Sequence, residues 1–144
     1  MEFGILGLEL AGKSTIFSLL TGTTVQASHG KQGAHLGIAH VPDGRLDALS
    51  ALFKPKKHTP ATVRFVDVPG IVKGGAQALN LPELRTMDGL AVVLRGFADD
   101  SLPHPEGSID PARDFELIET ELLLADLGVV TSRLERLARD LARR

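Results

Sequence analysis

Short runs of hydrophobic residues alternate with polar, glycine-rich segments over most of the chain. Four of these runs have the length and composition of strands: residues 3–6, 36–41, 62–68 and 90–94. The last run is apolar throughout, as expected for a strand that is buried on both faces. Apolar residues at helical spacing predict helices over residues 14–20, 45–53 and 83–87.

The C-terminal part of the chain reads as one long helix from Asp110 to Arg144. Asp110 is a typical N-cap residue, and Pro111 fits the first helical position. Gly128 is the weak point, because a glycine inside a helix costs about 1 kcal/mol relative to alanine. Apolar residues four and three positions apart form a heptad seam: Leu123, Leu127, Val130, Leu134, Leu137 and Leu141. Two alternatives remain open for this seam, which either pairs two copies of the chain as a homodimer or packs its first part on the sheet.

Strands that alternate with helices favour an α/β fold with a mainly parallel sheet and helices on its faces. We expect about four strands from the hydrophobic runs. The short link between residues 36–41 and 62–68 allows one of them to be antiparallel. Residues 1–109 would form the folded domain, and residues 110–144 would form a helical arm and one half of a coiled coil.

Composition indicates a soluble globular protein, since 43% of the 144 residues are hydrophobic and 24% are charged. A net charge of -2 gives no global attraction to nucleic acid or to an anionic membrane. The lack of cysteine excludes a disulfide framework and a cysteine-ligated metal. We see no signal peptide and no run long enough to cross a bilayer, so we expect a cytoplasmic protein without a membrane partner.

The remaining polar residues give weaker signals. No metal-ligand spacing is found among the histidines, which are expected to be polar surface or loop residues: His29, His35, His40, His58 and His104. The basic loop with Lys54, Lys56 and Lys57 could contact RNA phosphates or could simply be solvated. Because no tyrosine or tryptophan lies nearby to stack on a base, the solvated loop is favoured.

The strongest functional signal runs from Gly7 to Ser14, which fits G-x-x-x-x-G-K-[ST] between a predicted strand and a predicted helix. In this pattern successive main-chain N–H groups and the helix N-terminus converge on phosphates. Lys13 would act as the catalytic cation on the β- and γ-phosphates, and Ser14 would coordinate Mg²⁺. The residues expected to bind the nucleotide in this loop are Glu9, Leu10, Ala11, Gly12, Lys13, Ser14 and Thr15. The alternative is a glycine-rich turn closed by an exposed lysine.

A second phosphate contact is predicted at residues 67–70, which read D-V-P-G after a strand-like run. Asp67 would hold Mg²⁺ through a water, and the N–H of Gly70 would meet the γ-phosphate. The alternative is that Asp67 merely caps the end of the strand. The sequence therefore predicts Mg²⁺ as cofactor and a nucleoside triphosphate as ligand.

Taken together, these motifs resemble the Obg-like ATPases, the YchF branch of the translation-factor GTPases. Residues 41–49 read V-P-D-G-R-L-D-A-L, close to the family's V-P-D-x-R-L-D-x-L. Further similar strings cover nearly all the chain: residues 54–57, 63–67, 70–74, 110–114 and 120–127.

The resemblance implies a partial Ras-like G domain of the P-loop NTPase fold that binds ATP or GTP and hydrolyses the β–γ bond. It also implies the ribosome as a partner. The family has a hydrophobic residue where other GTPases keep a water-orienting glutamine, and Ile71 stands there. An isoleucine cannot polarise water, so the resemblance implies slow turnover or help from elsewhere.

The chain departs from the family pattern in its loops. Glu9 and Leu10 replace a proline and an asparagine of the family's phosphate loop. Leu10 cannot coordinate the monovalent cation that this asparagine is associated with, and Glu9 places negative charge near the phosphates. In the first switch, Lys31 is the nearest counterpart of a metal-binding threonine. Residues 76–81 replace most of the longer, glycine-rich second switch.

The family's base-reading Asn-x-x-Glu and its C-terminal ubiquitin-like domain have no counterpart, so ATP and GTP remain alternatives. The chain is either a piece of a longer protein or a reduced one. Two functions follow from these observations. One is a slow, translation- or ribosome-linked NTPase switch, and the other is a non-catalytic module that acts through its helix and protein partners.

Overall fold

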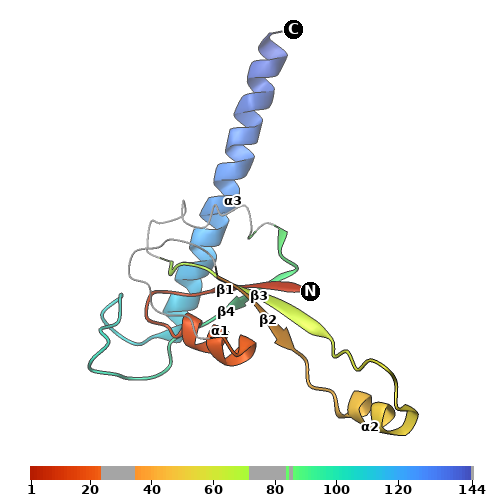
Figure 1. The fold of residues 1–144 in the computed structure, drawn as a ribbon. Coiled ribbons are helices and arrows are strands. Elements are labelled where there is room, and N and C mark those ends of the chain that lie inside the picture. Colours follow the sequence, from red (N-terminus) through yellow and green to blue (C-terminus); the bar gives the residue numbers. More distant parts are fainter. Residues whose placement is uncertain (24–34, 72–83, 85, 144) are drawn as a thin grey trace.

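The computed structural model describes residues 1–23, 35–71, 84 and 86–143. Its centre is a four-stranded sheet with the strand order β2-β3-β1-β4 (Figure 1). The strands are β1 (Glu2–Leu6), β2 (His35–His40), β3 (Thr62–Asp67) and β4 (Gly89–Val92). Each begins and ends within two residues of its predicted position. Of the predicted short helix at residues 83–87, residues 83 and 85 lie outside the described part of the chain, and residues 84 and 86 have 3₁₀ conformation.

Strand β1 is central and pairs in parallel with both β3 and β4. Strand β2 pairs with β3 in the antiparallel direction. The prediction of a mainly parallel sheet with one antiparallel strand is therefore confirmed. Because β1 and β3 are parallel, their carboxyl ends meet at one edge of the sheet, where Ile5 lies opposite Asp67.

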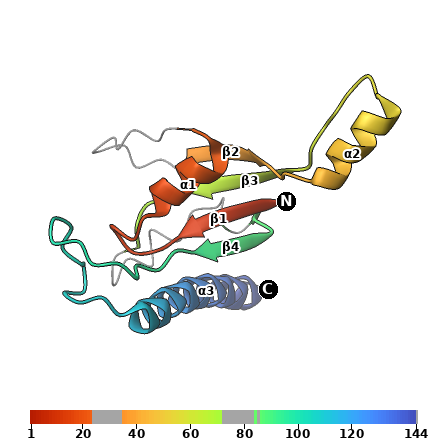
Figure 2. The ribbon, with the colours of Figure 1, turned by 90° about the horizontal axis from the view of Figure 1, so that it is seen from below.

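Helix α1 (Lys13–Thr21) follows β1 and packs against β1, β2 and β3 (Figure 2). Its Phe17 is almost fully buried. A Cβ atom on Gly37 of β2 would lie 2.7 Å from the Phe17 ring, so this glycine lets the helix approach the strand. The helix ends at Gly22, whose φ of 66° is left-handed and whose N–H donates to the Ser18 carbonyl.

Helix α2 (Gly44–Phe53) lies at the far end of the β2–β3 pair and projects from the sheet (Figure 1). Asp43 caps its start by accepting a hydrogen bond from the Arg45 N–H at 3.0 Å. None of its residues is buried, so α2 does not contribute to the core.

Helix α3 (Pro111–Ala142) runs beside β4 and continues well beyond the sheet (Figures 1 and 2). Asp110 accepts from the Arg113 N–H at 3.1 Å, which confirms the predicted N-cap, and Gly128 does not interrupt the helix. Ile118 on its first part is buried against the core. The heptad seam is not the face that packs there, because Leu123 and Leu127 are both exposed.

The main core joins residues from the sheet, its carboxyl-end loops and α3: Leu6, Leu8, Val66, Val68, Ile71 and Ile118. Leu8 of this cluster belongs to the loop that joins β1 to α1, so the core supports that loop. Among the described residues, no helix has both the length and the apolar character needed to cross a membrane.

Candidate functional site

The loop between β1 and α1 is shaped by two glycines. A Cβ atom on Gly7 would lie 2.4 Å from the Val93 carbonyl oxygen, so no side chain fits at this position. Gly12 has a φ of 94°, a left-handed conformation that other residues rarely adopt, and it starts α1. Glycine at these two positions therefore allows the backbone to turn tightly before α1.

The N-terminus of α1 points its main-chain donors into this loop. No side chain caps the helix there. The first N–H groups of a helix lack partners within the helix, and they carry the positive end of its dipole. Since Lys13, Ser14 and Thr15 form this first turn, their amides are available to an anion.

Lys13 folds back over the loop. Its side chain is buried, with 7% of the residue exposed, and Nζ donates a hydrogen bond to the Leu8 carbonyl at 2.7 Å. Burial lowers the pKa of Lys13, while the nearby negative charges of Asp67 and Glu9 act in the opposite direction. The alternative of a turn closed by an exposed lysine is therefore wrong.

Ser14 and Asp67 meet across the sheet edge. The Ser14 hydroxyl donates to Asp67 Oδ2 at 2.7 Å, while Asp67 Oδ1 is buried without a hydrogen-bond partner among the described residues. A hydroxyl and a carboxylate with an unused oxygen are the hard ligands that Mg²⁺ prefers. The pair fits a magnesium ion whose other ligands would be waters and phosphate oxygens. No larger group of acidic, histidine or cysteine ligands occurs in the described parts of the chain.

The loop after β3 closes directly on the phosphate loop. The Ile71 N–H donates to the Gly7 carbonyl at 3.0 Å, and Ile71 forms a parallel bridge with Leu8. A Cβ atom on Gly70 would lie 2.6 Å from Glu9 Cγ and 3.1 Å from the Glu9 amide nitrogen. Gly70 therefore lies against the phosphate loop, where a side chain would separate the two segments.

The side chain of Ile71 is not a reactive group of the phosphate loop. It is 2% exposed and belongs to the apolar core. The position at which other GTPases keep a water-orienting glutamine thus serves packing in this structure.

The other predicted loop residues differ in exposure. Ala11 is buried, whereas Glu9, Leu10 and Thr15 are exposed. Leu10 has a φ of 59°, in the left-handed region. A branched apolar residue is unfavourable there by roughly 1–2 kcal/mol, whereas asparagine is tolerated.

His104 lies in a loop, as the sequence predicts, but it is not on the surface. Its side chain is 5% exposed, and its Nε2 lies 3.0 Å from Asp114 Oδ2. The other oxygen of Asp114 accepts from Arg113 at 2.8 Å. This buried group links the loop after β4 to the start of α3. The helical pattern places Asp114 in the predicted helix, but no sequence motif indicates that it contacts a histidine ten residues earlier.

Other predicted features lie outside the described residues. These are His29, Lys31 with the first switch around it, and residues 76–81 of the second switch. Their predicted roles stay predictions.

Leu10 offers a direct test of the loop backbone. Leu10→Asn should stabilise the ligand-free protein by about 1 kcal/mol, because asparagine tolerates the left-handed conformation. Urea unfolding followed by circular dichroism would measure this. Leu19→Asn is the matched control, since Leu19 is exposed within α1 and the change should cost roughly 0.5 kcal/mol. Equal destabilisation by both changes would contradict the strain at Leu10.

Comparisons with known proteins agree with this geometry. No protein-family model matches the chain. The chain is 37% identical over 144 residues to the ribosome-binding ATPase YchF of Bacillus subtilis, covering 94% of this chain and 39% of that protein. It is 39% identical over 147 residues to the protein of the same name from Mycoplasma genitalium, covering 96% and 40%.

A solved structure gives the same relationship. The YchF GTPase of Schizosaccharomyces pombe superposes with a TM-score of 0.72 at 32% identity, covering 96% of this chain and 39% of that one. The fold is therefore that of a partial P-loop, Ras-like G domain. The chain spans about two fifths of the length of these relatives, since 39% of the Bacillus protein is matched. Over that span, the resemblance to the Obg-like ATPases of the YchF family is confirmed.

Proposed function

We propose that the loop from Gly7 to Ser14 binds the triphosphate of ATP or GTP with Mg²⁺ and supports slow hydrolysis of the β–γ bond. The observation that carries the proposal is the buried Lys13 ammonium, which lies over an uncapped helix N-terminus and beside Asp67. A buried cation is costly unless an anion compensates it. A phosphate group supplies that compensation.

Each residue of the site has a separate task in this proposal. The main-chain N–H groups at the start of α1 hold the phosphate oxygens, and Lys13 exchanges its bond to the Leu8 carbonyl for one to phosphate. Ser14 and Asp67 would hold the metal, which would neutralise charge on the phosphates. Gly70 lies against Glu9 of the loop, and its N–H would meet the γ-phosphate.

We expect slow turnover because Ile71 takes the place of a water-orienting group and Glu9 adds an opposing charge. Ile71 is in the core and cannot orient a water. Glu9 is close enough to influence Lys13, so its charge also opposes a phosphate. Hydrolysis would then depend on positioning and electrostatic stabilisation by Lys13 and the main chain.

The names of the relatives support the biological setting. Two are ribosome-binding ATPases, and the solved relative is described as a GTPase. We infer a translation-linked role in the cytoplasm, with residues 1–109 as the nucleotide-binding part and residues 110–144 as the arm. ATP and GTP are both candidate ligands, because the curated relatives are named ATPases and the solved relative is named a GTPase.

Substitution of Lys13 tests this function. Lys13→Ala should abolish phosphate release and the increase in melting temperature that Mg·ATP or Mg·GTP produces in the unchanged protein. The free energy of unfolding without ligand should change little, since burial of the Lys13 ammonium is itself unfavourable.

The pH dependence of stability gives a second measurement. Burial lowers the pKa of Lys13 in the folded state, so ligand-free stability rises with pH as Lys13 deprotonates, and Lys13→Ala should remove this rise. Arg136→Ala, far along α3, is the control for both assays. Phosphate release at the same rate in the Lys13 variant would rule out the enzyme.

A second function is favoured by the exposed seam of α3. Its residues beyond the sheet are uncovered within the described structure, including Leu127, Leu134 and Leu141. Exposed apolar stripes of this length favour association. The alternative function is therefore a non-catalytic G-domain module that acts through α3 and protein partners, including a second copy of the chain.

Charges beside the seam favour one arrangement of two copies. Arg133 and Asp140 occupy equivalent heptad positions and have opposite signs. If Leu134 faces the partner's Leu137 in an antiparallel pair, Arg133 faces the partner's Asp140. The opposite charges support this register.

Light scattering across a range of concentrations measures the association. We expect a dimer at high concentration that Leu134→Glu converts to a monomer, because a charge would enter the apolar seam. Ser132→Glu, on the outer face of the same helix, should leave the dimer intact. A monomer at every concentration would contradict the pairing.

A further inference from the structure

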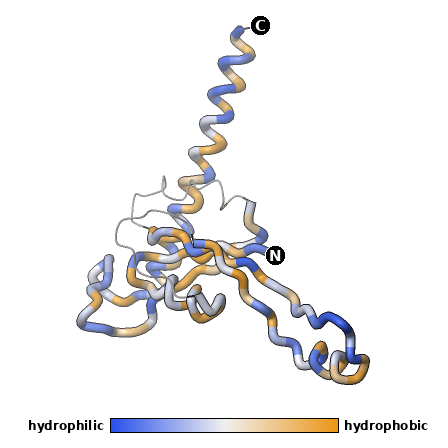
Figure 3. The backbone as a smooth tube through the Cα atoms, viewed as in Figure 1, coloured by the Kyte–Doolittle hydropathy of each residue, from blue (hydrophilic) through white to orange (hydrophobic). Residues whose placement is uncertain are grey.

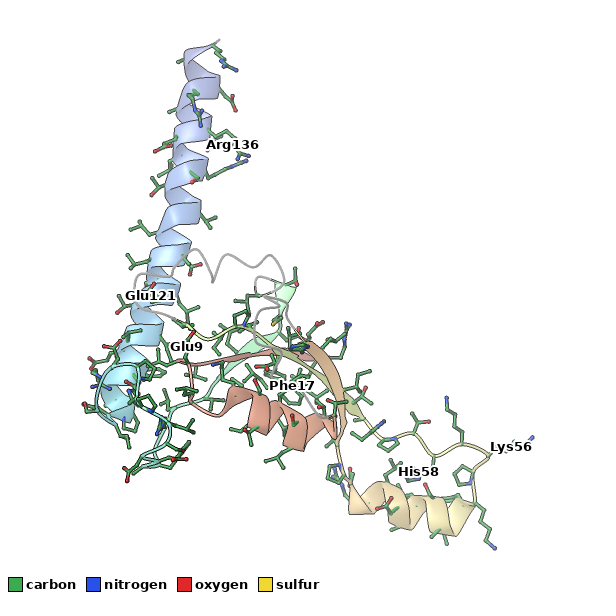
Figure 4. All side chains as sticks on the ribbon, turned by 60° about the vertical axis from the view of Figure 1, so that its left-hand side comes forward. Glu9, Phe17, Lys56, His58, Glu121 and Arg136 are labelled. Atoms are coloured by element: carbon green, nitrogen blue, oxygen red, sulfur yellow. The ribbon has the colours of Figure 1, made fainter. Side chains whose placement is uncertain are left out.

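The segment between β2 and β3 forms a projecting finger, which we define as residues 41–61. At its base, the Val41 N–H donates to the Ala61 carbonyl at 2.9 Å. Beyond this bond the chain forms α2 and a return loop, away from the phosphate site (Figure 1). Figure 4 shows Lys56 at the outer end of the finger and His58 on the return loop beside α2.

The finger carries positive charge that its own carboxylates do not neutralise. Asp43 pairs with Arg45 at 2.9 Å, and Asp47 lies 3.4 Å from His58. The hydrogen bond from the Arg45 side chain lowers the pKa of Asp43, which keeps this carboxylate ionised and occupied. In the described structure, the ammonium groups of Lys54, Lys56 and Lys57 form no ion pair or hydrogen bond. Three cations within four positions therefore face solvent in a chain whose net charge is -2.

A flat hydrophobic side chain lies next to these cations. Phe53 and Leu52 are each 73% exposed, and Phe53 immediately precedes Lys54. Figure 3 shows hydrophobic turns of α2 beside the hydrophilic return loop. The lack of tyrosine and tryptophan near this loop favoured a merely solvated loop. Phe53 is an exposed aromatic ring beside the lysines, so a ring that could stack on a base is present.

A side-chain contact joins the return loop of the finger to α2. The Ser50 hydroxyl and His58 Nδ1 lie 2.7 Å apart, which ties the return loop to the helix. Lys54 has a φ of 44° and ends α2, a position that usually favours glycine. A lysine there is unfavourable by roughly 1–2 kcal/mol, and such strained positions occur often at functional sites.

We propose that this finger binds RNA, with Lys54, Lys56 and Lys57 on the phosphate backbone and Phe53 stacked on an unpaired base. Charge complementarity favours a polyanion, and the adjacent ring favours one that also has aromatic bases over an acidic protein surface. This assignment rests on the proposed ribosome-linked role for its biological setting, but it is independent of nucleotide binding at Lys13.

Fluorescence anisotropy with a labelled RNA stem-loop that has an unpaired loop tests the proposal. The unchanged chain should bind with an affinity that falls as salt rises. The triple variant Lys54→Ala, Lys56→Ala, Lys57→Ala should lower the affinity at least tenfold and flatten the slope of log K against log salt by about 2. Phe53→Ala should lower the affinity about fivefold or more while leaving the slope unchanged.

Matched variants distinguish RNA binding at the finger from a general effect of the net charge of the chain. Removal of three arginines from α3, in Arg136→Ala, Arg139→Ala, Arg143→Ala, lowers the net charge equally and should leave RNA binding unchanged. Replacement of the three finger lysines by arginine should retain it. Equal losses from both triple alanine variants, or tighter binding to polyglutamate than to the stem-loop, would overturn the proposal. Melting shifts with Mg·ATP and Mg·GTP, measured on the same variants, report separately on the nucleotide site and should not change.

Discussion

The site depends on one constraint, which is the cost of holding the Lys13 ammonium inside the protein. The side chain is 7% exposed and has the Leu8 carbonyl as its hydrogen-bond acceptor. An ordinary surface lysine would extend into water, where its charge is better solvated. Here the glycines of the loop and the start of α1 surround it instead, so the fold maintains a buried positive site next to unpaired main-chain donors. In the proposed function, a phosphate group would satisfy both.

The pairing of the strands explains why Asp67 lies next to the phosphate loop. Parallel pairing of β1 with β3 brings Asp67 to the same edge as the phosphate loop, within hydrogen-bond reach of Ser14. The core beneath this edge includes Leu8 and Ile71, which belong to the two site loops themselves. Packing and site geometry are therefore coupled. The finger and α3 extend away from this edge, which leaves their surfaces available for other contacts.

Much of this arrangement follows from the sequence because the signals are local. Hydrophobic runs set the strands, Asp110 and Pro111 set the start of α3, and the glycine–lysine pattern sets the phosphate loop. The antiparallel direction of β2 is less local, because residues 41–61 contain α2 and would also be long enough for a parallel crossover. Local patterns are enough to predict these elements because each one is bounded by its own turn or cap.

Tertiary contacts explain the remainder. The heptad seam is the most regular pattern in α3, yet the face that packs on the core is the one with Ile118. His104 is buried because Asp114 lies opposite it in the fold, although the two are ten positions apart. The left-handed backbone conformation of Leu10 also cannot be predicted from the sequence, since leucine rarely adopts it.

The convergence of main-chain amides on a phosphate is the central claim, and amide chemical shifts measure it directly. A two-dimensional ¹H–¹⁵N spectrum of the labelled protein would be followed as Mg·pyrophosphate is added. The account predicts that the largest shifts occur at Gly12, Lys13, Ser14, Thr15 and Gly70, with little change along α3 beyond Leu127. Saturating ligand that leaves those amides unmoved, or that moves residues elsewhere instead, would contradict the account.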